Sequence, residues 1–162
     1  MACDFTIDIQ ENVALISLGD CPSGAAFLAD VLRRIAETGT DVDMIALAPG
    51  SSGRAALSFT VSDDDFARVL GVTGSLQKEN PALKVSVSNG YAKITVGGEP
   101  MDGAPGVAAK VFAAIKNAAD LRMVTTALTE ISLLVPVSDG RIHWRHCAEA
   151  SRREPIFACA VL

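Results

Sequence analysis

Apolar residues follow two different periods along this chain, and the alternation between them predicts a mixed α/β protein. An apolar residue at every second position, as at Phe5, Ile7 and Ile9, predicts a half-buried strand, whereas apolar residues three or four positions apart predict a helix. The predicted strands span 5–9, 13–18, 42–47, 55–61, 85–87, 91–96, 121–127, 131–137 and 156–162. The predicted helices span 28–38, 107–119 and 142–152, and a further helix starts at residue 66. The predicted order is therefore βαββαβ, twice, with irregularities at both ends of the chain.

Polar and glycine-containing segments predict where these elements are interrupted. Glu11 and Asn12 separate the first two predicted strands. Asn89–Gly90 is a strong two-residue hairpin signal, so it is predicted to reverse the chain between the strands on either side. Two glycines leave the end of the helix from residue 66 ambiguous, and Pro81 sets its outer limit.

The chain nearly repeats itself after roughly 79 residues, and such a repeat predicts two copies of one structural unit. Segments 14–18, 41–45 and 57–61 return as segments 92–96, 120–124 and 131–135. A copy of about 75 residues buries only around 60% of its unfolded surface, which is marginal for an independent domain. We therefore expect the copies to be stabilised by packing on each other or by dimerisation.

Composition and charge exclude several classes of partner. Hydrophobic residues make up 49% of the chain and aromatic residues only 5%, so the predicted core is aliphatic. The net charge of -5 argues against nucleic acid, because phosphate binding requires clustered lysines and arginines. The one basic cluster, 141–153, is mixed with acids and is most simply a solvated helix face. Without a membrane-length apolar run or a signal peptide, the sequence predicts a cytoplasmic protein with no membrane partner.

Few side chains suggest catalysis or metal binding. The four cysteines have no paired spacing, so we expect reduced and buried thiols. His143, His146 and Cys147 can share a helix face, but no further group completes a closed metal site. No nucleophile–base arrangement and no complete phosphate-binding loop is visible in the sequence. The sequence therefore predicts no catalytic residues, no metal and no cofactor.

Several of these segments carry a family resemblance that covers about residues 5–150. The segment 101–112, followed by 124–126 and 131–135, resembles the second ACT domain of aspartokinases. In the first copy, segments 41–45 and 57–61 resemble the corresponding strands of the first ACT domain of that family.

The resemblance implies an α+β fold of two ferredoxin-like βαββαβ (ACT) units packed side by side, with antiparallel sheets and helices on one face. It implies a first unit at 10–88 and a second unit at 89–162. In the family, the strand before the first unit joins the sheet of the second unit, so segment 3–9 is expected to cross over. The apolar segment 156–162 is not part of that pattern and competes for the same edge.

The resemblance also implies an amino-acid-sensing regulatory module rather than a catalyst. Paired ACT units of that family dimerise and bind lysine, threonine or a similar effector at their interface, which alters a kinase domain earlier in the chain. That kinase domain is absent here, so we expect a free-standing regulatory subunit, a product of an internal start or an orphan sensor. Two other interpretations remain open: a ligand-free protein that docks onto a separate kinase subunit, and an enzyme in its own right.

A free amino acid presents an ammonium and a carboxylate, so its receptor needs carboxylates or carbonyls beside unpaired backbone N–H groups. Helix N-termini supply such N–H groups, and glycine lets the backbone approach a ligand closely. The loop 101–106 leads into a predicted helix, and acids at the starts of neighbouring strands are candidate ammonium partners. The candidate effector-binding residues are Asp20, Asp41, Asp43, Met101, Asp102, Gly103, Gly106, Val107, Asp120, Thr125 and Thr126.

Several candidates also have a purely structural interpretation: Gly106 can simply start a helix, Asp41 and Asp120 can end turns, and the two threonines can be exposed strand residues. The first copy departs further from the family pattern, in segment 20–26. From Gly24 to Asp41 the chain is longer than across the equivalent stretch of the second copy. Either the first copy takes an effector other than lysine or threonine, or its site is not functional.

Overall fold

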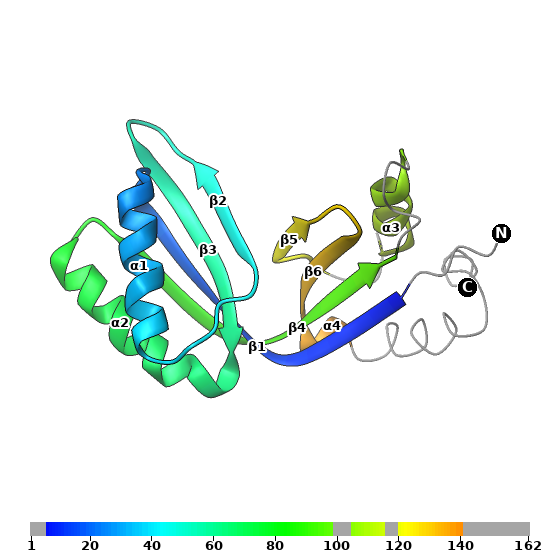
Figure 1. Cartoon of the computed structure of the whole chain (residues 1–162), viewed down its shortest axis with the longest axis horizontal. Helices are drawn as coiled ribbons and strands as arrows, with labels where there is room; N and C mark the ends of the chain where they lie inside the picture. Colours follow the sequence, from blue (N-terminus) through cyan, green and yellow to red (C-terminus); the bar gives the residue numbers. More distant parts are fainter. Residues whose placement is uncertain (1–5, 99–104, 116–119, 141–162) are drawn as a thin grey trace. The chain divides into compact units, whose positions relative to one another are not determined.

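The computed structural model of the chain describes residues 6–98, 105–115 and 120–140 (Figure 1). Its strands are β1 (Thr6–Pro22), β2 (Ile45–Pro49), β3 (Arg54–Ser62), β4 (Lys84–Gly97), β5 (Met123–Thr126) and β6 (Glu130–Pro136). Its helices are α1 (Ala25–Glu37), α2 (Phe66–Glu79), α3 (Val107–Ile115) and α4 (Val137–Gly140), with a 3-10 turn, η1 (Asp63–Asp65), before α2. The helix predicted at 142–152 and the strand predicted at 156–162 lie outside the described residues.

The chain divides into two compact units. We call residues 12–90 the inserted unit, and residues 1–11 together with 91–162 the split unit. Strands β1 and β4 each contribute residues to both units. Strand β1 therefore begins in the split unit, and the other strands of that unit come from the second half of the sequence.

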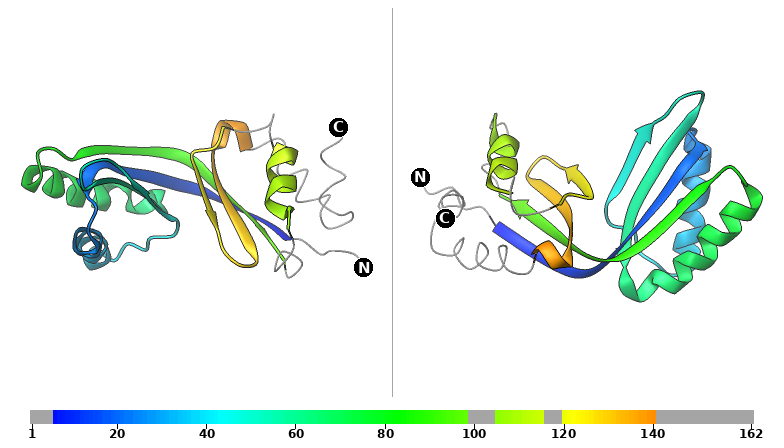
Figure 2. Two further views of the ribbon diagram at one scale, coloured as in Figure 1. Left: turned by 90° about the horizontal axis from the view of Figure 1, so that it is seen from above. Right: turned by 180° about the vertical axis from the view of Figure 1, so that it is seen from behind.

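The inserted unit has the element order βαββαβ, and its strands are ordered β2-β3-β1-β4. Strand β3 pairs antiparallel with both β1 and β2. Helices α1 and α2 cover one face of these strands (Figures 1 and 2). The largest fully buried side chains of this aliphatic core are Ile16, Leu18, Val31, Ile35, Leu57, Phe59, Val69 and Leu76. The ferredoxin-like arrangement predicted for the first copy is confirmed.

The split unit repeats the same layered arrangement. Its strands follow the order β1-β4-β6-β5, and β6 pairs antiparallel with both β4 and β5. Val111 and Ile115 of α3 are buried against the inward-facing residues of β4 and β6. Ile7 and Ile9 of β1 pack against the same cluster, and the Thr6 hydroxyl donates to the carbonyl of Gly97 at 3.2 Å.

The sequence repeat appears in the structure as one cross-strand register used twice. Ser17 on β1 faces Ser58 on β3, and their hydroxyl oxygens lie 2.9 Å apart. At the equivalent positions of the split unit, Thr95 on β4 faces Ser132 on β6, with hydroxyl oxygens 3.3 Å apart. The two copies therefore share the pairing of individual residues as well as the order of elements.

Both predicted breaks within the long strands are wrong. Strand β1 runs through Glu11 and Asn12, and β4 runs through Asn89 and Gly90, so no hairpin reverses the chain there. Asn12 has a φ of 61° and Gly90 a φ of 82°. Asparagine and glycine tolerate this left-handed conformation at a single residue, whereas a type I′ hairpin needs two such residues in succession. A single left-handed residue at each of these two points disturbs the strand locally without turning the chain back.

The ambiguous end of the second helix is also resolved. Helix α2 continues through Gly71 and Gly74 to Glu79, two residues before Pro81. A glycine in a helix interior costs about 1 kcal/mol relative to alanine, but burial of Val69 and Leu76 offsets that cost. Tertiary packing therefore overrides the local signal of the glycines.

The backbone conformations of two glycines predict opposite effects of the same substitution. Gly106, just before α3, has a φ of 88°, which a side chain disfavours even though an added Cβ meets no atom within 4 Å. We expect Gly106→Ala to lower the free energy of unfolding by about 1 kcal/mol. The matched control is Gly71→Ala, within α2 and equally free of contacts, which should raise it by about 0.5–1 kcal/mol. Urea denaturation followed by circular dichroism measures both, and equal effects would contradict the conformational explanation.

Candidate functional site

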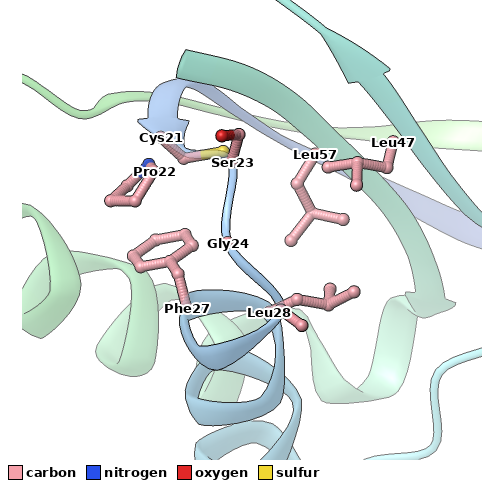
Figure 3. Close-up of a pocket in the computed structure, with 9 residues that line it drawn as sticks. Cys21, Pro22, Ser23, Gly24, Phe27, Leu28, Leu47 and Leu57 are labelled. Carbon is pink, nitrogen blue, oxygen red and sulfur yellow. The ribbon is translucent and has the colours of Figure 1, made fainter. Parts of the chain in front are cut away.

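The inserted unit contains a pocket of about 170 Å³ where β1 leads into α1 (Figure 3). Three segments that are distant in sequence form it: the stretch from the end of β1 to the start of α1, one residue of β2 and one of β3. The lining residues are Cys21, Pro22, Ser23, Gly24, Ala25, Phe27, Leu28, Leu47 and Leu57. Cys21 and Leu57 are buried, whereas Ser23, Gly24, Ala25 and Leu47 are exposed at its rim.

An irregularity at the end of β1 produces this turn. The register between β1 and β3 shifts between Leu18 and Cys21, and Asp20 in that stretch has a φ of 55°. Beyond it, the backbone N–H of Ser23 donates to the carbonyl of Gly53 at 3.1 Å, which ties the turn to the β2–β3 loop. Helix α1 then begins after Gly24, whose extended backbone carries no side chain that could cap the helix.

The walls of the pocket are apolar. The Cys21 thiol donates to the carbonyl of Ala55 at 3.2 Å, so its hydrogen-bonding capacity is used within the protein. Among the described residues that line the pocket, none carries a charge, and Ser23 supplies the one hydroxyl. The first turn of α1 contains no acidic residue. The pocket therefore combines an aliphatic and aromatic wall with the positive end of a 13-residue helix.

Asp20 lies one residue before the pocket, but its carboxylate is engaged elsewhere. Its Oδ2 lies 2.7 Å from Nζ of Lys84, and its carbonyl accepts a hydrogen bond of 2.9 Å from Arg54. The hydrogen bond from Lys84 and the charge of that ammonium lower the pKa of Asp20 below its ordinary value, with a smaller contribution from Arg54. Asp20 thus remains ionised and holds the end of β1 to the start of β4.

The acids at the start of β2 lie away from the turn into α1. The N–H of Asp43 donates to the carbonyl of Thr60 at 3.1 Å, near the end of β3. The opposite end of β2, at Pro49, pairs with Ala55, which in turn pairs with Cys21 at the pocket. The ends of β1 and β2 therefore lie at the same end of the sheet. The start of β2, with Asp43, lies at the other end. Asp41 precedes Asp43 and is exposed.

The split unit separates its candidate residues in the same way. Asp120 pairs with Arg122 at 2.8 Å, and the Arg122 N–H donates to the carbonyl of Leu134 at the far end of β6. Thr125 and Thr126 lie at the other end of β5, where β6 pairs with the last residues of β4.

Gly106 and Val107 start α3, and the N–H of Lys110 donates to the Gly106 carbonyl at 3.1 Å. Met101, Asp102 and Gly103 lie outside the described residues. In the split unit, the structure therefore places Thr125 and Thr126 at the end of the sheet from which the chain leaves β4 toward α3, and Asp120 at the other end.

Sequence reasoning missed the pocket because its walls resemble ordinary core. Leu28, Leu47 and Leu57 each fit the apolar period of a helix or strand, and nothing local distinguishes a pocket wall from a packed contact. The signal that was available is the departure of segment 20–26 from the family pattern, which marks the turn that opens the pocket.

Within 6–98, 105–115 and 120–140, no group of three or more His, Cys, Asp or Glu side chains is placed to hold a metal ion. Over the same residues, no helix has the length and apolar character needed to cross a membrane.

The Asp20–Lys84 pair gives a prediction for titration. Because the folded-state pKa of Asp20 is depressed, the pair contributes stability above the unfolded pKa of about 3.9 and loses it as the pH falls through the folded pKa. We expect Lys84→Gln to raise the pKa of Asp20 toward its ordinary value, measured by NMR titration of the side-chain carboxyl carbon. Arg68→Gln removes a different ion pair of the same unit, with Asp65, and should leave the Asp20 titration unchanged. An unaltered Asp20 pKa in the Lys84 variant would refute the pairing.

Comparison with known proteins identifies the fold. Residues 94–145 match the family model of an ACT domain. The aspartokinase of Geobacillus stearothermophilus is 28% identical over 130 residues, which is 80% of this chain and 31% of that protein. The chain thus spans about a third of the length of the curated relatives it matches.

Two solved structures match over 100% of both chains. The regulatory subunit of aspartate kinase from Thermus thermophilus, in its ligand-free form, has a TM-score of 0.76 at 25% identity. The regulatory subunit of aspartate kinase from Thermus flavus has a TM-score of 0.75 at 26% identity. Residues 94–145 therefore match an ACT domain, and the chain has the fold of aspartate kinase regulatory subunits.

Proposed function

We propose that this chain is a non-catalytic regulatory module of the aspartokinase type that binds a free amino acid. The observation that carries the proposal is the pocket at the start of α1, which lies in a ferredoxin-like unit and is open at its rim. Lysine and threonine are the effectors that the family resemblance implies, and they are the first to test. The activity that binding would modulate is that of an aspartate kinase.

The amino acid's carboxylate has a natural place at the first turn of α1. Backbone N–H groups at a helix start lack intrahelical partners, and the helix dipole favours negative charge there. The first turn of α1 adds no acidic side chain that would repel a carboxylate. The start of α3 is the equivalent position in the split unit, where we propose that Gly106 and Val107 act together with Thr125 and Thr126.

We also propose that the module is a homodimer and that the effector site lies at an interface between ACT units of two copies. In the strand order of the described residues, β2 and β5 are the two edges. Neither strand carries a charged residue, although charges commonly protect sheet edges from pairing. Ile45 on β2 is 41% exposed, and Val124, the equivalent residue on β5, is 37% exposed. Exposed apolar residues at equivalent positions of two uncharged edges favour pairing with a second copy.

A panel of the twenty amino acids tests the sensing function. A ligand present at 100 times its dissociation constant stabilises the folded state by about 2.7 kcal/mol, so one or two amino acids should raise the Tm measurably. The corresponding amino-acid amides, which lack the free carboxylate, are the matched controls and should have little effect. A flat panel would contradict sensing and favour the alternative, in which the chain docks onto a separate kinase subunit without a ligand.

Substitution at the edge of β2 tests the dimer. Ile45→Lys places a charge on the edge strand and should weaken self-association at least tenfold, measured by sedimentation equilibrium. The control is Leu70→Lys on α2, because Leu70 is 43% exposed and lies on no sheet edge. Equal association constants for the two variants would exclude β2 as the interface.

A further inference from the structure

The chemistry of the pocket walls restricts the side chain that the pocket accepts. We infer that the inserted unit selects an amino acid with an uncharged aliphatic side chain of about three or four carbons, and that it discriminates against lysine. This inference rests on the proposed function, because it assumes that a free amino acid is the ligand.

The size of the pocket fits such a side chain. Its volume of about 170 Å³ is close to that of an engineered cavity of about 150 Å³ that is lined by leucine, isoleucine and phenylalanine and binds benzene. The walls here are of the same kind, with Phe27 and Leu28 from α1, Leu57 from β3 and Leu47 from β2 (Figure 3). A straight or branched chain of four carbons is smaller than benzene, so it can occupy this space.

The acid next to the pocket is already paired and so does not attract the ammonium of a lysine side chain. Asp20 is the acid closest in sequence to the lining residues, and its carboxylate is held at 2.7 Å by Lys84. Arg54 donates to the carbonyl of Asp20 at 2.9 Å, which places a positive charge on the same side. An unpaired charge in an apolar environment is strongly disfavoured, so the terminal ammonium of lysine would have to stay outside. Lysine would then lose the contacts that an aliphatic chain of equal length makes with the walls.

The side chains of the walls also offer a ligand little hydrogen-bonding capacity. The Cys21 thiol already donates to Ala55, and the Ser23 backbone N–H already donates to Gly53. The hydroxyl of Ser23 is the remaining side-chain polar group among the described lining residues, and it lies at the exposed rim. A threonine side chain would therefore bury its hydroxyl against carbon, whereas an aliphatic side chain buries only apolar surface.

A homologous series of ligands tests the inference on the unmodified chain. L-alanine, L-2-aminobutyrate, L-norvaline and L-norleucine share the same ammonium and carboxylate and differ by one methylene at each step. Each buried methylene contributes about 0.8 kcal/mol, so isothermal titration calorimetry should give about a fourfold gain in affinity per step. L-lysine has the carbon chain of L-norleucine with an added ammonium, and it should bind at least tenfold more weakly than L-norleucine.

Two adjacent alanines provide matched variants. Ala25 lines the pocket, whereas Ala26, the next residue in the same exposed first turn of α1, does not. Ala25→Leu should fill the space and weaken L-norleucine binding at least about tenfold while leaving L-alanine binding within about threefold. Ala26→Leu makes the same change in helix propensity and should leave the whole affinity series unchanged.

The outcomes separate this inference from the proposed function. Tighter binding of lysine or threonine than of L-norleucine, or an affinity independent of chain length, would overturn the aliphatic assignment and leave amino-acid sensing intact. Equal effects of the two leucine substitutions would overturn the location of the site. Failure of every amino acid to bind would overturn both proposals.

Discussion

The antiparallel pairing of β3 with β1 and β2 is the constraint on which the rest of the inserted unit depends. It brings the end of β1, the start of β3 and the end of β2 to one end of the sheet, where Cys21 pairs with Ala55 and Ala55 with Pro49. Helix α1 must start at that end, because the chain leaves β1 there. A pocket lined by residues as distant in sequence as Cys21, Leu47 and Leu57 is a direct consequence of this register.

Hydrophobic periodicity was sufficient to predict most elements, because burial of one face imposes the same period on sequence and structure. It predicted α1, β3 and β6 closely, and the internal repeat correctly anticipated that Ser58 and Ser132 would occupy equivalent positions. It was wrong at Asn12 and Gly90, where a single residue of positive φ resembles a turn but lies inside a long strand. Local propensity describes what a residue tolerates, whereas the pairing of distant strands determines whether the chain reverses.

The candidate site was less predictable, because it depends on which ends of the strands meet. Asp43 lies at the opposite end of the sheet from the start of α1, next to Thr60, and only the direction of the strands determines this. The engagement of Asp20 by Lys84 joins residues distant in sequence, and no local pattern could have revealed it. The glycine before the helix of the second copy, by contrast, was a useful signal, because Gly106 directly precedes α3 in the structure.

The two copies have kept their sheet register but not the conformation of these helix starts. The cross-strand pairs Ser17–Ser58 and Thr95–Ser132 correspond, because they lie within paired strands where a change disturbs neighbours on both sides. Gly24, however, is extended with a φ of −77°, whereas Gly106 is left-handed with a φ of 88°. The chain therefore enters the two helices with different backbone conformations. A duplicated fold of this kind can preserve its core while its two halves acquire different ligand specificities.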